Sequence, residues 1–149
     1  MTRFLAFIFC LVALPVFAGE IIPATIKTKN GILNISLEVA ATPDAREVGL
    51  SKRNNIGEAD GMIFVFSKAN DYEFWMKDTK IPLDMLFVEP NKHKIAFIAA
   101  DTVPFSLTPI GAKQKIQAVI ELDAGRAASD GIAVGDVVNY EIPKTIRVY

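Results

Sequence analysis

The sequence has 149 residues, a formal net charge of −1, one histidine and one cysteine. A chain of this length suits one domain that buries roughly two-thirds of its unfolded surface. The near-neutral charge argues against the basic surface that nucleic-acid binding requires. One histidine and one cysteine also leave too few nitrogen and sulfur ligands for a zinc or copper site, so we expect no metal centre.

The first 18 residues have the pattern of a cleavable signal peptide. Arg3 precedes an apolar run over residues 4–14, and Val16-Phe17-Ala18 supplies a small-residue cleavage pattern before Gly19. A membrane-spanning helix needs about 20 apolar residues, and Glu20 ends this run early. A retained anchor is therefore the less favoured alternative.

Cleavage near Ala18-Gly19 leaves residues 19–149 as a single domain, which we expect to be periplasmic or secreted. The sole cysteine, Cys10, is removed with the signal peptide, so the mature chain has neither a thiol nucleophile nor an intramolecular disulfide. Loss of Arg3 takes the formal net charge from −1 to −2. We expect no nucleic-acid partner and no stable membrane insertion after cleavage.

The first half of this domain begins with a predicted β-hairpin. Asn30-Gly31 favours a two-residue turn between strands at 21–29 and 32–40. Thr42 followed by Pro43 then predicts the start of a short helix that continues to about Leu50. A loop is expected at 54–60, and further strands are expected at 61–67, 72–77 and 84–89.

The second half continues the same pattern of short strands. Strands are expected at 94–100, 115–122, 136–142 and 145–149, with a loop at 103–111. A second short helix is expected at 124–130, with Asp123 as its cap and Gly131 at its end. The whole pattern predicts a mainly β fold at the α+β margin, a compact antiparallel barrel or sandwich with two short helices.

Aromatic and charged groups are most concentrated in the predicted hairpin from Phe74 to Asp84. Strand alternation places Trp75 and Lys77 on one face, with Asp78 in the turn and Asp84 on the returning strand. An indole beside an ammonium and two carboxylates suits the binding of a small polar ligand. The structural alternative makes Trp75 a core aromatic, Asp78 a turn residue, and Lys77 with Asp84 a solvated ion pair.

Arginine supplies one more candidate for ligand binding. Arg46 and Arg53 lie on or after the first predicted helix, and a guanidinium can clamp an anionic group with two parallel hydrogen bonds. Surface solvation or a salt bridge is the alternative for both. The candidate ligand-binding set is therefore Trp75, Lys77, Asp78, Asp84 and Arg53.

Successive blocks of the sequence resemble a known family. They are Gly49-Leu50, Arg53, residues 61–66 (GMIFVF), 74–79 (FWMKDT), 81–84 (IPLD) and 131–136 (GIAVGD). In this order, over roughly Ile26 to Ile142, they resemble domain-of-unknown-function family 192. The resemblance implies a small β-rich domain, often exported in bacteria, and no established reaction, cofactor or catalytic residue. The chain departs from the family pattern at Ser51, where methionine is usual, and at Asp78, where asparagine is common.

Carboxylates offer the remaining route to catalysis. Five lie near predicted strand ends and are candidates for an acid–base pair or an all-oxygen calcium site: Asp78, Asp84, Glu121, Asp123 and Asp136. The only histidine, His93, lies in a turn-like segment without a nucleophile-elbow motif nearby, so we predict a surface role for it.

Together these patterns favour an exported, non-catalytic domain without a cofactor. We predict that it binds a small molecule, glycan or protein segment at the hairpin from Trp75 to Asp84. One alternative is a carboxylate-based hydrolase or lyase. The other is an accessory protein that pairs with an exported partner through a β-edge.

Overall fold

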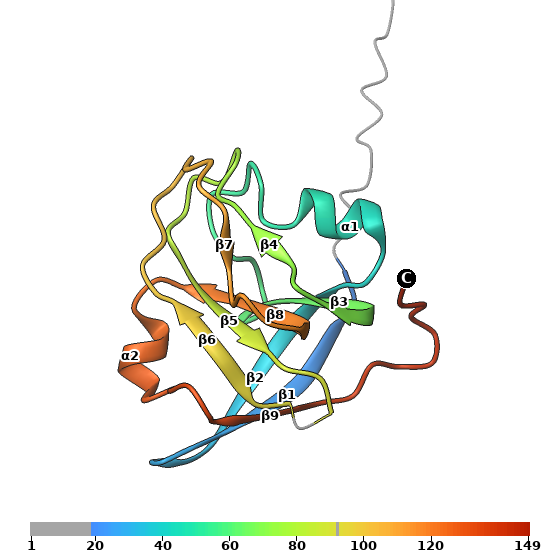
Figure 1. The fold of residues 1–149 in the computed structure, drawn as a ribbon, viewed down its shortest axis with the longest axis vertical. Coiled ribbons are helices and arrows are strands. Elements are labelled where there is room, and N and C mark those ends of the chain that lie inside the picture. Colours follow the sequence, from blue (N-terminus) through green and yellow to red (C-terminus); the bar gives the residue numbers. More distant parts are fainter. Residues whose placement is uncertain (1–18, 92) are drawn as a thin grey trace, which may run out of the picture.

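The computed structural model describes residues 19–91 and 93–149, which form a curled seven-stranded sheet, a two-stranded sheet and two short helices (Figure 1). The mainly β fold is as predicted. The predicted signal peptide, including Cys10, lies outside the described residues. In the described part of the chain, no helix has the length and apolar character that crossing a membrane requires.

The seven-stranded sheet has the strand order β6-β5-β8-β3-β2-β1-β9, and β4 pairs with β7 in the smaller sheet. In chain order the elements are β1 (Ile21–Thr28), β2 (Gly31–Ala40), α1 (Pro43–Val48), β3 (Gly61–Asn70), β4 (Glu73–Phe74), β5 (Leu83–Val88), β6 (Ile95–Ala99), β7 (Ile110–Gly111), β8 (Ile116–Asp123), α2 (Arg126–Asp130) and β9 (Val137–Tyr140).

The predicted hairpin of β1 and β2 is present, but its turn lies one residue earlier than Asn30-Gly31. Thr28 pairs with Gly31, so Lys29 and Asn30 form the loop. The Thr28 hydroxyl accepts a hydrogen bond from the Asn30 N–H and donates one to the Gly31 carbonyl, both at 3.1 Å. Gly31 has a φ of +123°, which favours glycine, and this position is the first residue of β2 and not part of the loop.

One strand pair differs from the expected antiparallel pattern, because β2 and β3 are parallel. Parallel neighbours need a crossover connection, and α1 with the loop over 49–60 supplies it. The crossover places α1 beside β4 (Figure 1).

The central strands β3, β5 and β8 are buried on both faces, which explains their long apolar runs. One face forms an inner core with β1, β2 and β9, through Ile26, Leu37, Ile63, Leu86, Ile120 and Val138. The other face forms an outer core beneath β4, β7 and the α1–β3 loop, through Leu50, Phe64, Met76, Met85, Phe87 and Val119.

The two edges of the large sheet approach each other without pairing along their length in the described residues. They meet at one bridge, Lys94 with Val137, and the N–H of Ile95 donates to the Asp136 carbonyl at 2.9 Å. Of the two predicted closures, the structure therefore shows a sandwich-like fold and not a closed barrel.

Three predicted element assignments were wrong: a strand that is shorter than expected, a short strand inside an expected loop, and an expected strand that does not form. The expected strand at 72–77 is reduced to Glu73–Phe74, and its partner β7 lies in the segment expected to be a loop. Residues 145–149 form no strand: after a turn in which the Ile146 N–H donates to the Pro143 carbonyl, Ile146 and Val148 pack on the inner core. Alternating apolar residues thus reflect one-sided burial here, without strand pairing.

Candidate functional site

A cleft of about 560 Å³ opens between α1, the start of the α1–β3 loop, and the segment from β4 to the following turn. It lies on the outer-core side of the large sheet. Its lining combines aromatic rings with charged groups of both signs: Arg46, Glu47, Val48, Gly49, Leu50, Ser51, Lys52, Phe64, Phe66, Tyr72, Glu73, Phe74, Trp75, Lys77, Asp78, Thr79 and Glu121.

Helix α1 forms one wall and starts as the sequence predicts. The Thr42 hydroxyl accepts a hydrogen bond from the Ala45 N–H at 3.1 Å, and Pro43 begins the helix. Gly49 ends it with a φ of +47° and lies against the Phe64 ring, where an added Cβ would be 3.0 Å from the ring. Glycine at this position therefore brings the end of α1 close to β3.

Arg46 is held in the wall of the cleft by backbone contacts. Its Nη1 donates to the carbonyls of Ala41 at 2.6 Å and Val65 at 3.1 Å. Its guanidinium carbon lies 4.8 Å from the centre of the Phe66 ring, which stacks on Tyr72 at 3.7 Å. Burial lowers the pKa of Arg46 from its ordinary value. Arg46 therefore fastens α1 to the sheet and shapes the wall.

Trp75 and Lys77 line the opposite wall and share one face, as expected from the sequence, although the strand itself ends at Phe74. Trp75 is 56 % exposed, so it is not a core aromatic, and the Lys77 Nζ lies 5.5 Å from the centre of its ring. Met76 between them is fully buried, and its N–H donates to the Ser106 carbonyl at 3.0 Å. The buried Met76 fixes the backbone so that its two neighbours face the cleft.

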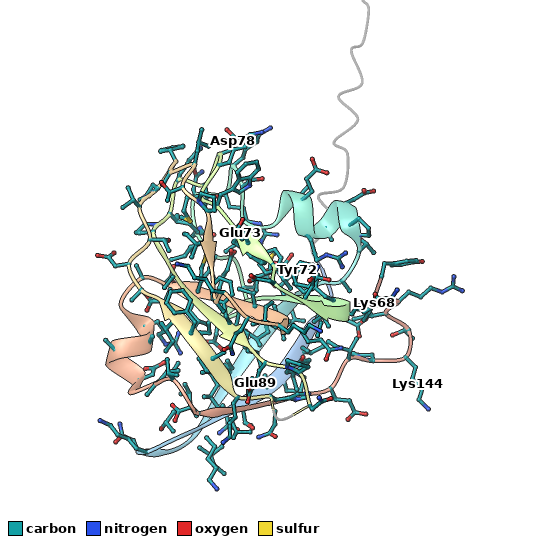
Figure 2. All side chains as sticks on the ribbon, viewed as in Figure 1. Lys68, Tyr72, Glu73, Asp78, Glu89 and Lys144 are labelled. Atoms are coloured by element: carbon teal, nitrogen blue, oxygen red, sulfur yellow. The ribbon has the colours of Figure 1, made fainter. Side chains whose placement is uncertain are left out.

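Asp78 follows in the turn, at the tip of the molecule, with Glu73 and Tyr72 nearer the sheet (Figure 2). It has a left-handed φ of +54°, and its carbonyl accepts a hydrogen bond from the Lys52 N–H at 2.8 Å. Aspartate and asparagine adopt this conformation more readily than other non-glycine residues. The turn therefore has a structural requirement that either residue meets.

Glu121 lines the bottom of the cleft. It lies opposite Met62 of β3 and Met85 of β5, so its side chain is on the outer-core face. Glu121 is 5 % exposed, and no group among the described residues forms a hydrogen bond or ion pair with its carboxyl group. No fully enclosed polar side-chain atom of the described residues lacks a partner, so the carboxyl oxygens of Glu121 are still open to the cleft. Burial raises the pKa of Glu121 to about 8. The bottom of the cleft therefore holds a carboxyl group that is largely uncharged at neutral pH.

Asp84, a predicted ligand residue, does not line the cleft. It is fully buried at the start of β5, where its carboxylate accepts hydrogen bonds from the N–H groups of Asp101 and Ala127, both at 2.8 Å. The second bond caps the first turn of α2, which begins after Gly125 without a side-chain cap of its own. The prediction that Asp123 caps this helix was wrong, because Asp84 approaches it from a neighbouring strand.

Arg53 is also outside the cleft lining. Its guanidinium forms a two-point ion pair with Glu38 of β2, at 2.7 and 2.8 Å, and Nη1 also donates to the Ile56 carbonyl. Hydrogen bonding to Arg53 holds the pKa of Glu38 below its ordinary value, and the same contact raises the pKa of Arg53. The salt-bridge alternative that the sequence left open is the one observed.

The structure thus brings together three of the five predicted ligand residues, Trp75, Lys77 and Asp78. Of the five strand-end carboxylates, only Asp78 and Glu121 line the cleft. Among residues 19–91 and 93–149, no group of three His, Cys, Asp or Glu residues is placed to hold a metal ion.

Comparison with known proteins identifies the family. The model of domain-of-unknown-function family 192, DUF192, described as "Uncharacterized ACR", matches residues 24–140. The chain belongs to the DUF192 family. None of the curated proteins matches it.

Two solved structures show the same fold. A protein of unknown function from Novosphingobium aromaticivorans DSM 12444 is 36 % identical, with a TM-score of 0.78 over 85 % of this chain and 89 % of that chain. A protein from Sinorhizobium meliloti 1021, described as a proposed transcription regulator, is 31 % identical, with a TM-score of 0.77 over 83 % of this chain and 95 % of the other.

The DUF192 match includes every cleft-lining residue. The sequence identified Glu121 only as one of five strand-end carboxylates and did not include it in the candidate ligand-binding set. The signal in the sequence was a lone acid in the apolar run from Ile116 to Leu122. Ile120 and Leu122 face the inner core, so alternation directs Glu121 to the other face. What lies on that face depends on β3 and β5, which are distant in sequence.

Proposed function

We propose that this DUF192 domain is a non-catalytic binding protein that takes a small organic ligand in the cleft between α1 and β4. One observation carries the proposal: Glu121 is buried at the bottom of an aromatic-lined cleft, with no hydrogen-bonding partner among the described residues. Buried polar groups in proteins nearly always have hydrogen-bond partners, and the fold supplies none to this carboxyl group while leaving it open to the cleft, where a ligand can reach it.

The size and chemistry of the cleft support a small ligand. Its volume of about 560 Å³ is within the range of about 300–1,000 Å³ typical of ligand sites. Phe64, Phe66 and Phe74 supply apolar contact area, while Lys77 and Asp78 supply polar groups near the mouth. Apolar contact area combined with polar groups that fix orientation is the usual composition of a ligand site.

The proposal includes export, because the signal-peptide pattern at residues 1–18 directs the domain to the periplasm or beyond. The ligand is then a molecule available outside the cytoplasm. One structural relative is described as a proposed transcription regulator, but a net charge of −1 gives this chain little attraction for DNA. The charge therefore favours small-molecule binding over DNA binding.

The experiment that tests this function blocks the cleft and a second hollow separately. Ser51→Trp places an indole in the cleft, whereas Asn34→Trp places one in a shallower hollow of about 450 Å³ beside β1, β2 and β9. A small-molecule library is screened against the wild type by thermal shift, and hits are mapped by NMR chemical-shift changes. We expect hits that perturb cleft residues, survive Asn34→Trp and are lost in Ser51→Trp. Hits that map elsewhere, or no hits, would contradict the proposal.

A further inference from the structure

We infer that the ligand of this cleft carries an organic ammonium group, which forms an ion pair with Glu121 at the bottom of the cleft. The inference rests on the proposed function and specifies its ligand class. It is argued from three features of the cleft: the unpartnered carboxyl group, the cations already committed elsewhere, and the aromatic lining.

The first feature is the state of Glu121. Its neighbours across the sheet, Met62 and Met85, offer no charge and no hydrogen-bond donor to its side chain. A carboxylate in such surroundings is costly unless a cation pairs with it. An ammonium group supplies both an opposite charge and several N–H donors. The side chains next to Glu121 supply neither.

The second feature is that no basic side chain of the cleft takes this place in the described residues. The Arg46 guanidinium donates hydrogen bonds to two backbone carbonyls, which hold it in the wall of the cleft. Lys52 and Lys77 are exposed, and the Lys77 ammonium lies over the Trp75 ring. A cation from outside therefore has no internal competitor for Glu121 among these residues.

The third feature is the balance of aromatic and charged groups around Glu121. Aromatic faces attract organic cations, and five rings line the cleft: Phe64, Phe66, Tyr72, Phe74 and Trp75. The acids that line it with Glu121 are Glu47, Glu73 and Asp78. Arg46, Lys52 and Lys77 balance these three charges, so the preference for a cation comes from the aromatic rings and from Glu121 itself.

An ammonium ligand makes a pH-dependent prediction that other ligands do not. Because burial keeps Glu121 protonated at neutral pH, pairing with a cation requires it to ionise. Binding then releases up to about one proton per ligand near pH 6.5, and affinity rises with pH until Glu121 is ionised in the free protein. The other charged or titratable side chains that line the cleft are Glu47, Glu73, Asp78, Lys52, Lys77, Arg46 and Tyr72.

The test uses three probes of similar shape and different charge: 2-phenylethylammonium, 2-phenylethanol and 3-phenylpropionate. Isothermal titration calorimetry in two buffers of different ionisation enthalpy measures affinity and proton release together. We expect the ammonium probe to bind at least about tenfold more tightly than the other two and to release a proton.

Two variants show whether Glu121 is responsible. Glu121→Gln keeps the size of the side chain and removes its ability to ionise, so we expect loss of the preference for the ammonium probe and of proton release. Asp123→Asn removes a charge from the same strand at an exposed residue outside the cleft lining, and should change affinity by less than about threefold. Circular dichroism and the retained binding of 2-phenylethanol to Glu121→Gln report that the variant is folded.

The outcomes separate this inference from the proposed function. Equal or tighter binding of the neutral or anionic probe in the cleft overturns the ammonium assignment and leaves a ligand cleft in place. The same follows if Glu121→Gln binds the ammonium probe as tightly as the wild type. Binding of no probe, together with no hit from the library screen, overturns both.

Discussion

Two buried carboxyl groups, Asp84 and Glu121, lie on neighbouring strands and have opposite surroundings. Asp84 accepts two hydrogen bonds from backbone N–H groups and holds the start of α2 to the sheet. Glu121 faces the cleft without such a partner, and burial raises its pKa to about 8. A buried acid whose hydrogen bonds are satisfied stabilises the fold. A buried acid without hydrogen-bond partners lowers the stability of the folded state.

The same contrast divides the predicted ligand residues into those that have partners within the fold and those that face the cleft. Asp84 and Arg53 are engaged by partners within the fold, and neither lines the cleft. Trp75 and Lys77 are exposed at the cleft wall. The following four predictions test this division between structural and ligand-facing groups, beginning with the substitution that we expect to cost the most stability.

Replacing Asp84 should be the most damaging change. Asp84→Ala leaves the N–H groups of Asp101 and Ala127 without their acceptor and should lower the free energy of unfolding by about 3 kcal/mol, measured by urea denaturation. Asp123→Ala is the matched control on the next strand, near the same helix, and should cost less than about 0.5 kcal/mol because Asp123 is exposed. Equal losses in the two variants would show that Asp84 is not the cap of α2.

Glu121 should make the wild type less stable as pH rises. Between the ordinary glutamate pKa of 4.5 and the folded value of about 8, the folded state binds more protons than the unfolded state. The free energy of unfolding attributable to Glu121 therefore falls through this window, by up to about 1.4 kcal/mol per pH unit, and levels off above it.

Comparison with Glu121→Gln isolates this dependence from that of the other groups. The variant should gain stability relative to the wild type as pH rises from 5 to 8, measured by denaturation at each pH. A difference between wild type and variant that is constant across this range would contradict the buried, unpartnered state of Glu121.

The ion pair of Arg53 with Glu38 should give a smaller effect. Arg53→Ala leaves Glu38 with the Gly19 N–H as its remaining partner and should cost about 1–2 kcal/mol at pH 7. Because the pKa of Glu38 is lowered in the folded state, this contribution should be present above pH 4.5 and disappear as pH falls below it. Unchanged ligand affinity in Arg53→Ala is expected; a loss would return Arg53 to the binding site.

Trp75 should matter least for stability. Trp75→Ala removes a side chain that is 56 % exposed and should change the free energy of unfolding by less than about 0.5 kcal/mol. Its buried neighbour gives the control, since Met76→Ala should cost at least about 2 kcal/mol. A comparable loss from both would make Trp75 a core residue, as the structural alternative held.

The features that the sequence predicted well depend on nearby residues. The start of α1 follows from Thr42 and Pro43. Trp75 and Lys77 share a face as expected, although β4 ends at Phe74 and the sequence left open whether Trp75 is exposed. The hairpin was placed correctly to within one residue for the same reason.

What the sequence did not predict depends on pairing between distant strands. Asp84 reaches α2, 43 residues further along the chain, and Glu121 meets Met62 across a pair of central strands. The parallel pair of β2 and β3 also arises from a crossover whose path no local pattern specifies. A residue can therefore be recognised as unusual from its sequence context, while its partners follow only from the strand register.

The central claim is that Glu121 is a buried acid without a hydrogen-bond partner in the fold, and that it binds a cationic ligand. Carbon-13 NMR of the Glu121 side-chain carboxyl group tests it most directly, by titration of the free protein and of the protein saturated with 2-phenylethylammonium. We predict a midpoint near pH 8 in the free protein, and a carboxyl group that is ionised at pH 7 when the ligand is bound. A midpoint near 4.5 in the free protein, unchanged by the ligand, would contradict the account.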